Sequence, residues 1–129
     1  MSNAGSSLLL LVEDEALLCD LLEDALRDEG FDVAVARDGP AAIILLNRYR
    51  SEVAGLITDI DLGSPTDGWS VAAAARALQP RLPVIYVSGA SAHEWNAKGV
   101  ADSLMIAKPF PLGRLTDVVK TALRPGAAA

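Results

Sequence analysis

Cysteine, histidine and basic residues are scarce in this sequence of 129 residues. The single cysteine, Cys19, cannot form an internal disulfide, and one cysteine with one histidine cannot build a zinc site. Only 11 residues are Lys or Arg against 17 Asp or Glu, which gives a formal net charge of -6. A nucleic-acid surface needs clustered cations, so we expect no nucleic acid on this chain and protein partners instead.

Long hydrophobic runs and a secretory leader are also missing from the sequence. No apolar stretch approaches the length of a membrane span, and the start MSNAGSS lacks the charged and apolar regions of a signal peptide. A lone cysteine suits a reducing compartment, so we expect a cytoplasmic protein without membrane contact. We expect residues 1–6 to be a disordered or expression-derived N-terminus, residues 125–129 to be a flexible tail, and residues 7–124 to form the functional domain.

What the sequence does contain is an alternation of apolar strands and amphipathic helices, repeated five times. The β-branched or leucine-rich runs predict strands, and apolar residues at helical spacing predict the helices between them. Such alternation predicts an α/β fold with a doubly wound, five-stranded parallel sheet in the order 2-1-3-4-5 and five helices. The expected strands are 8–12, 31–36, 55–58, 82–87 and 103–107, and the expected helices are 15–29, 38–50, 68–79, 92–98 and 111–122.

Acidic side chains follow two of these strands where each strand ends. Glu13 and Asp14 come directly after the first strand, and Asp59 follows the third. In the predicted order these strands are neighbours, so the three acids should share one crevice at the sheet's rim. Like charges crowded there repel unless a cation offsets them, and Mg²⁺ prefers such oxygen ligands. The spacing therefore predicts a magnesium site.

Two further side chains are expected at the same rim. Ser88 ends the fourth strand, and Lys108 follows the fifth. A metal ion, a cation and a hydroxyl around one carboxylate suit phosphoryl transfer, in which catalysis is mostly positioning and charge neutralisation. Asp59 would then be the nucleophile that takes the phosphoryl group.

Four segments together resemble the receiver domain of bacterial two-component response regulators: LLLVEDE, LITDIDL, VIYVSGA and AKPF. The resemblance covers about residues 7–124 and implies a flavodoxin-like fold. It also implies a cis peptide bond before Pro109 and a backbone carbonyl of Asp61 on the metal. By the same resemblance Glu13 and Asp14 are the metal-binding pair, Asp59 the phosphoacceptor, Ser88 the switch hydroxyl, and Lys108 the invariant lysine.

The resemblance also implies the partners and the activity. A histidine kinase or a histidine phosphotransfer protein would supply the phosphoryl group, and the only catalysis expected is self-catalysed phosphorylation and dephosphorylation of the receiver. A downstream protein or a second copy would bind the face made of the fourth helix, fifth strand and fifth helix. Phosphorylation would act by shifting a conformational equilibrium.

Two departures from the family pattern leave alternatives open. Met105 stands where the family usually has an aromatic switch residue, and the loop after Asp59 is one residue longer than usual. A degenerate receiver that only docks to partners fits these departures. Alternatively, the pair Asp59 and Asp61 resembles the Asp-x-Asp motif of haloacid dehalogenase-like phosphatases, in which the second Asp is a general acid. That alternative leaves Glu13 and Asp14 without a role.

Overall fold

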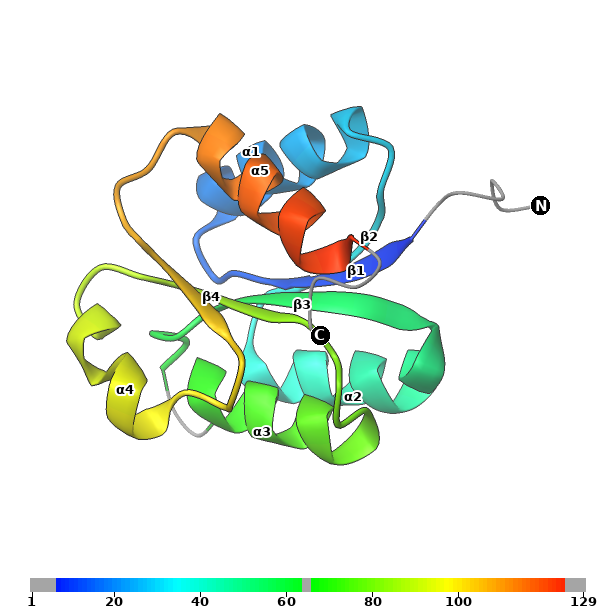
Figure 1. Ribbon diagram of the computed structural model, residues 1–129, viewed down its shortest axis with the longest axis vertical. Coiled ribbons are helices and arrows are strands. Elements are labelled where there is room, and N and C mark those ends of the chain that lie inside the picture. Colours follow the sequence, from blue (N-terminus) through cyan, green and yellow to red (C-terminus); the bar gives the residue numbers. More distant parts are fainter. Residues whose placement is uncertain (1–6, 64–65, 125–129) are drawn as a thin grey trace.

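The computed structural model describes residues 7–63 and 66–124. The predicted ends, 1–6 and 125–129, lie outside the described residues, as do two residues of the loop after Asp59. Five parallel strands form one sheet in the order β2-β1-β3-β4-β5, which confirms the predicted order (Figure 1). The strands are β1 (Leu8–Val12), β2 (Asp32–Ala36), β3 (Val53–Asp59), β4 (Val84–Ser88) and β5 (Leu104–Ala107).

Helices cover both faces of the sheet. On one face α1 and α5 lie side by side, and on the other face lie α2, α3 and α4 (Figure 1). The helices are α1 (Ala16–Asp28), α2 (Gly39–Tyr49), α3 (Gly68–Leu78), α4 (Trp95–Lys98) and α5 (Leu112–Leu123), and two short 3-10 helices, η1 (Arg50–Glu52) and η2 (Ala92–Glu94), precede β3 and α4.

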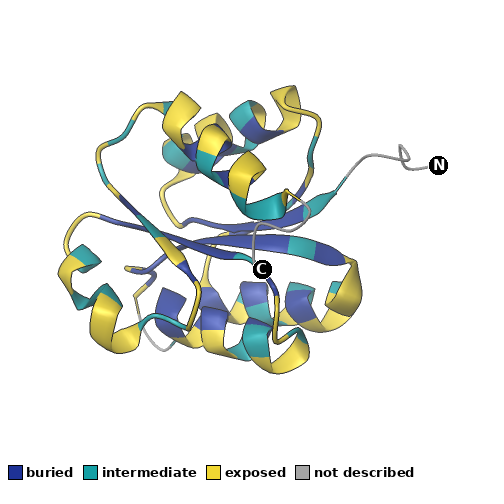
Figure 2. Cartoon of the chain, viewed as in Figure 1, coloured by how far each residue is buried: buried dark blue, intermediate teal, exposed yellow. Residues whose placement is uncertain are grey.

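The residues of β1, an interior strand of the sheet, are all apolar. Side chains alternate between the two faces of a strand, and here each face is covered by helices. Leu9 and Leu11 pack in the cluster under α1 and α5, whereas Leu10 and Val12 pack in the cluster under α2 and α3. Both clusters are buried, and the outer faces of the helices are exposed (Figure 2).

Several predicted boundaries and faces differ from the structure. The third strand is longer than predicted and contains Asp59 as its last residue, while the fourth begins at Val84 rather than residue 82. The segment predicted as one short helix over 92–98 is a 3-10 turn followed by four α-helical residues. Leu78 has the helical spacing of the buried residues of α3, but as the last residue of the helix it is 36% exposed.

Polar side chains cap the N-termini of α2 and α3. The side chain of Asp38 accepts a hydrogen bond from the backbone N–H of Ala41, so it caps α2. Asp67 caps α3 in the same way, by accepting from the N–H of Ser70. Across residues 7–63 and 66–124, no helix combines the length and the apolar character that crossing a membrane requires.

Candidate functional site

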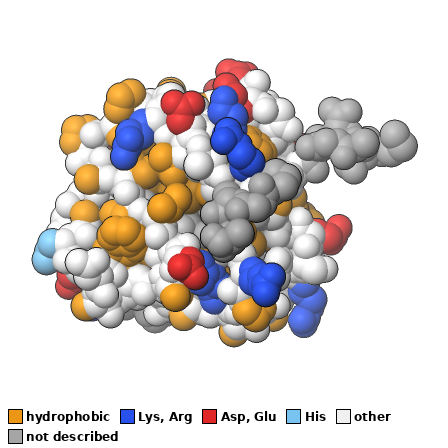
Figure 3. All heavy atoms as spheres, viewed as in Figure 1, with side chains coloured by type: hydrophobic (Ala, Val, Ile, Leu, Met, Phe, Trp, Pro, Cys, Tyr) orange, Lys and Arg blue, Asp and Glu red, His pale blue; other side chains and the backbone are white. Residues whose placement is uncertain are grey.

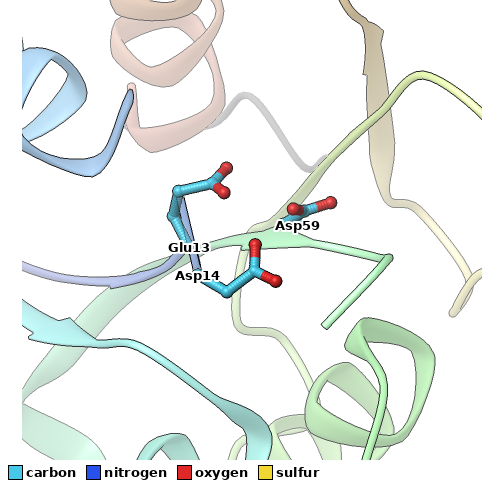
Figure 4. Close-up of side chains that lie close together, drawn as sticks. All are labelled: Glu13, Asp14 and Asp59. Carbon is cyan, nitrogen blue, oxygen red and sulfur yellow. The ribbon is translucent and has the colours of Figure 1, made fainter. Parts of the chain in front are cut away.

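The predicted site residues come together where the parallel strands end. The register of β1 and β3 places Val12 beside Thr58, so the residues that follow, Glu13 and Asp59, are also adjacent. Glu13 and Asp14 project from the end of β1 toward Asp59 across this boundary (Figure 4). The β1–β3 neighbourhood thus brings together acids that are distant in the sequence, as the strand order predicts.

The three carboxylates form a compact acidic group. One oxygen from each of Glu13, Asp14 and Asp59 lies within 4.8 Å of the other two. Glu13 is 1% exposed and Asp59 4% exposed, whereas Asp14 lies open to solvent. Three oxygen donors at this spacing, with one side open, are the donor set that a hard divalent cation prefers. Their chemistry and burial therefore fit a divalent-ion site.

Lys108 supplies a positive charge to the same group. Its Nζ lies 3.3 Å from Oδ2 of Asp59 and 3.4 Å from Oε1 of Glu13. The backbone N–H of Lys108 donates to the carbonyl of Ser88 at 2.9 Å, which continues the pairing of β5 with β4 past the end of the strand. The Lys108–Pro109 peptide bond is cis, as the family resemblance implied. The ammonium contacts two of the three acids.

The crowding of charges changes the pKa of two groups. The pKa of Glu13 is raised to about 7, because burial and the neighbouring charge of Asp59 together outweigh the N–H of Glu15 and the ammonium of Lys108, which lower it. Burial alone would lower the pKa of Lys108, but the charges of Asp59 and Glu13 outweigh it and raise that pKa. Without a further cation, the pocket carries more negative charge than one lysine offsets.

Backbone N–H groups fix the two buried carboxylates. The N–H of Glu15 donates to Oε2 of Glu13 at 3.0 Å, and the N–H of Asp61 donates to Oδ1 of Asp59 at 3.0 Å. Close packing also fixes the end of β3, because α3 begins at Gly68 directly against the backbone of Asp59 and Ile60. The acid pair is therefore held by short loops rather than by long side-chain networks.

The hydroxyl of Ser88 lies in a contact that the sequence did not predict. Ser88 is completely buried, and its Oγ donates to Oδ2 of Asp61 at 3.0 Å. Ser91 also donates from its Oγ to Oδ1 of Asp61, at 2.7 Å. For the metal, the family resemblance implies only the backbone carbonyl of Asp61. An acid two residues after Asp59 and a second serine near Ser88 were the available signals.

The position of the missing aromatic switch residue is also defined. Met105 is half-buried on β5 and pairs across the sheet with Tyr86 of β4. Tyr86 is fully buried, stacks at a tilt on Trp69 with ring centroids 4.8 Å apart, and accepts the N–H of Val100 on its hydroxyl. The aromatic ring in this layer thus belongs to β4, and Met105 packs beside it.

Comparison with known proteins decides the family. The family model described as "Response regulator receiver domain" matches residues 9–120. The chain belongs to this family. Receiver domains of response regulators are the phosphorylated parts of two-component systems, so this domain belongs to a signalling family. The matched region contains every residue of the candidate site.

Relatives and solved structures agree with this assignment. The chain is 35% identical over 118 residues to the transcriptional regulatory protein PrrA of Mycobacterium tuberculosis, covering 89% of this chain and 49% of PrrA. It therefore spans about half the length of that curated relative. A response regulator receiver protein from Sinorhizobium medicae superposes with a TM-score of 0.89 at 37% identity, covering 95% of this chain and 98% of that one.

A third receiver domain carries a metal ion. The receiver domain of a sensor histidine kinase from Pseudomonas aeruginosa was solved with a magnesium ion coordinated in its active site cleft. It shares the fold of this receiver domain, with a TM-score of 0.79 at 24% identity, covering 92% of this chain and 98% of that one. Because sequence and fold both match receiver domains, the phosphatase alternative has lost its support.

Proposed function

We propose that this receiver domain takes a phosphoryl group onto Asp59 from a histidine kinase or a histidine phosphotransfer protein. One observation carries the proposal: acids from the ends of β1 and β3 lie within 4.8 Å of one another, with the ammonium of Lys108 in contact. A lone strand-end Asp would not support it, because such residues often only cap turns. Here the carboxylate has the surroundings that phosphoryl transfer needs.

In the proposed transfer, a carboxylate oxygen of Asp59 forms a bond to phosphorus as the donor's P–N bond breaks. The electron pair of the broken bond stays on the imidazole nitrogen of the donor, and the product is an aspartyl phosphate. Lys108 would neutralise one phosphoryl oxygen, and the hydroxyl of Ser88 would donate to another. Hydrolysis of the aspartyl phosphate by water would reset the domain.

The same proposal includes Mg²⁺ at the acidic group. Glu13, Asp14 and Asp59 would hold it with their carboxylates, together with the backbone carbonyl of Asp61. When bound, Mg²⁺ would offset the charge of the carboxylates and of the incoming phosphoryl oxygens. The magnesium ion in the Pseudomonas aeruginosa receiver domain, whose fold is the same, supports this assignment.

Intact-mass measurement with acetyl phosphate and Mg²⁺ tests the proposal. We expect the wild-type domain to gain one phosphoryl group, Asp59→Asn to gain none, and a matched exposed acid on α5, Asp117→Asn, to behave as wild type. Replacing Mg²⁺ by EDTA should abolish labelling of the wild type. Equal labelling of Asp59→Asn would place the acceptor elsewhere, and a wild type that never labels would make this a docking module.

The proposed output surface is the face formed by α4, β5 and α5. Hydrophobic side chains gather on this side of the molecule, over β5 (Figure 3). Leu104 is 41% exposed there, and Met105 and Val118 are half-buried. A protein target or a second copy would cover these side chains. Sedimentation with and without acetyl phosphate and Mg²⁺ tests the second-copy version, for which Leu104→Ser should weaken any phosphorylation-dependent dimer.

A further inference from the structure

The side chain of Asp61 bridges two loops at the edge of the site. Its Oδ2 accepts from Ser88 at the end of β4, and its Oδ1 accepts from Ser91 in the loop before η2. The backbone N–H of Ser91 also donates to Oγ of Ser88, at 2.9 Å. Three residues therefore close a hydrogen-bonded ring between the loop after β3 and the loop after β4.

Counting donors shows what this ring does to Ser88. A serine hydroxyl has one proton and two lone pairs. The proton of Ser88 is donated to Asp61, and one lone pair accepts the N–H of Ser91. The hydroxyl is fully buried, so no solvent competes for it. While the ring is closed, Ser88 has no proton left to donate to a phosphoryl oxygen.

Asp61 also touches the acceptor itself. Its backbone N–H donates to Oδ1 of Asp59, while its side chain binds the hydroxyl of Ser88. A phosphoryl group on Asp59 would replace the single charge of its carboxylate by about two, so about one further negative charge would lie beside the Asp61 carboxylate. It would also offer Ser88 a new acceptor. The added charge and the new acceptor would both favour breaking the hydrogen bond between Ser88 and Asp61.

We propose that the Asp61 side chain is a latch that holds Ser88 and Ser91 in the unphosphorylated domain and is displaced by the phosphoryl group. Asp61 is a positioning residue that acts through Ser88. Release of Ser91 then frees the segment of η2 and α4, which follows it directly. The latch rests on the proposed phosphorylation of Asp59, and it adds a residue whose side chain opposes the phosphorylated state.

Four variants separate the latch from a general effect of charge. Asp61→Ala removes both hydroxyl acceptors, and Asp61→Asn keeps a single oxygen to accept. Ser91→Ala removes one bond of the ring and leaves the charge of Asp61 in place. Glu94→Gln is the matched control, because Glu94 lines the same open pocket as Asp61 and Ser91 but pairs with Lys98.

The first readout is the ratio of phosphorylated to unphosphorylated domain at a fixed concentration of acetyl phosphate and Mg²⁺, measured by intact mass. We expect this ratio to rise about threefold to tenfold in Asp61→Ala. Of the two hydrogen bonds that this variant loses, the one from Ser88 competes directly with the phosphoryl group, and a charge-assisted hydrogen bond is worth about a factor of ten. The ratio should rise less in Asp61→Asn and Ser91→Ala, and in Glu94→Gln it should equal the wild-type ratio.

The second readout is the backbone ¹H–¹⁵N spectrum of the unphosphorylated proteins. The amide of Ser91 donates to Ser88 only while the ring is intact, so its resonance reports the latch. We expect the Ser91 resonance of Asp61→Ala to lie on the path that wild type follows on phosphorylation. A merely structural effect of Asp61 would move this resonance off that path.

The outcomes distinguish the latch from the function on which it rests. A wild type that labels, together with an Asp61→Ala ratio equal to or below the wild-type ratio, overturns the latch and leaves phosphorylation of Asp59 standing. An equal rise in Glu94→Gln also overturns it, since charge alone would then explain the effect. A wild type that never labels overturns both proposals.

Discussion

Replacing Lys108 by Met tests how far one ammonium offsets the acidic group. The Nζ lies 3.3 Å from Asp59 and 3.4 Å from Glu13. At an effective dielectric constant of about 20, each such contact corresponds to about 5 kcal/mol of Coulomb attraction. Most of this is cancelled by desolvation of the ammonium, because only 26% of the lysine side chain is exposed.

The net cost of the substitution is smaller than for a fully buried pair. Removing one partner of a buried ion pair typically costs about 3 to 5 kcal/mol. Here Glu13, with a pKa of about 7, can take up a proton and relieve the repulsion. We therefore expect Lys108→Met to lose about 2 kcal/mol of unfolding free energy in EDTA, a fall in Tm on the order of 8 °C for a domain of this size.

Magnesium should reduce this difference in unfolding free energy between Lys108→Met and the wild type. The variant has lost the competing cation, so Mg²⁺ should bind it about tenfold more tightly than the wild type, which recovers about 1.4 kcal/mol at saturation. Thermal unfolding with and without Mg²⁺ measures both numbers. Lys120→Met is the control, since it removes only an exposed ion pair with Glu29, which solvent screens. If the difference in unfolding free energy between wild type and Lys108→Met is the same in EDTA and in Mg²⁺, the reasoning is refuted.

Three further perturbations have outcomes that the structure defines. Tyr86→Phe leaves a backbone N–H without its acceptor and should cost about 1 to 2 kcal/mol. Burial raises the pKa of Tyr86 above its ordinary value of 10.0, so the contribution of this group to stability is present below pH 10 and is lost as the pH rises beyond it. Unfolding of the variant should therefore depend less steeply on alkaline pH. Gly68→Ala places a methyl group into the backbone at the end of β3 and should cost about 3 kcal/mol or more in urea unfolding, whereas Gly113→Ala, with open space around it, should change stability by less than about 1 kcal/mol. Asp14→Asn should weaken Mg²⁺ binding about tenfold by titration calorimetry without unfolding the domain, and the exposed Asp20→Asn on α1 should leave it unchanged.

The sequence predicts the placement of acids and lysine because that placement follows from the backbone. Parallel strands deliver the residues after their carboxyl ends to one rim, so the order 2-1-3-4-5 is enough to bring Asp59 beside Glu13. The apolar runs of the strands indicate that both faces of the sheet are covered. These features depend on the order and burial of whole strands, so an error of one or two residues in a predicted strand boundary does not change them.

The contacts of side chains in loops depend on loop conformations, which the pattern of apolar and polar residues does not predict. The bridge from Asp61 to Ser88 and Ser91 requires particular conformations of two loops, the one after β3 and the one after β4. Leu17 shows that apolar spacing also does not decide which side chains of a helix are buried. It belongs to the apolar residues of α1 by spacing but is 69% exposed, because leucines there occupy more than the buried face.

The segment after Ser91 is attached to the domain mainly by side chains, which makes it the natural recipient of a change at the site. Its α-helix has four residues, so few backbone bonds hold it internally. It is anchored instead by Trp95, whose ring nitrogen donates to Oγ of Ser103 at 2.9 Å, and by the hydroxyl of Tyr86, which accepts the N–H of Val100. Segments with few buried backbone bonds open at low free-energy cost. A ring flip at position 105 is therefore not required for a signal, because breaking the contacts of Ser91 loosens the same segment from its other end.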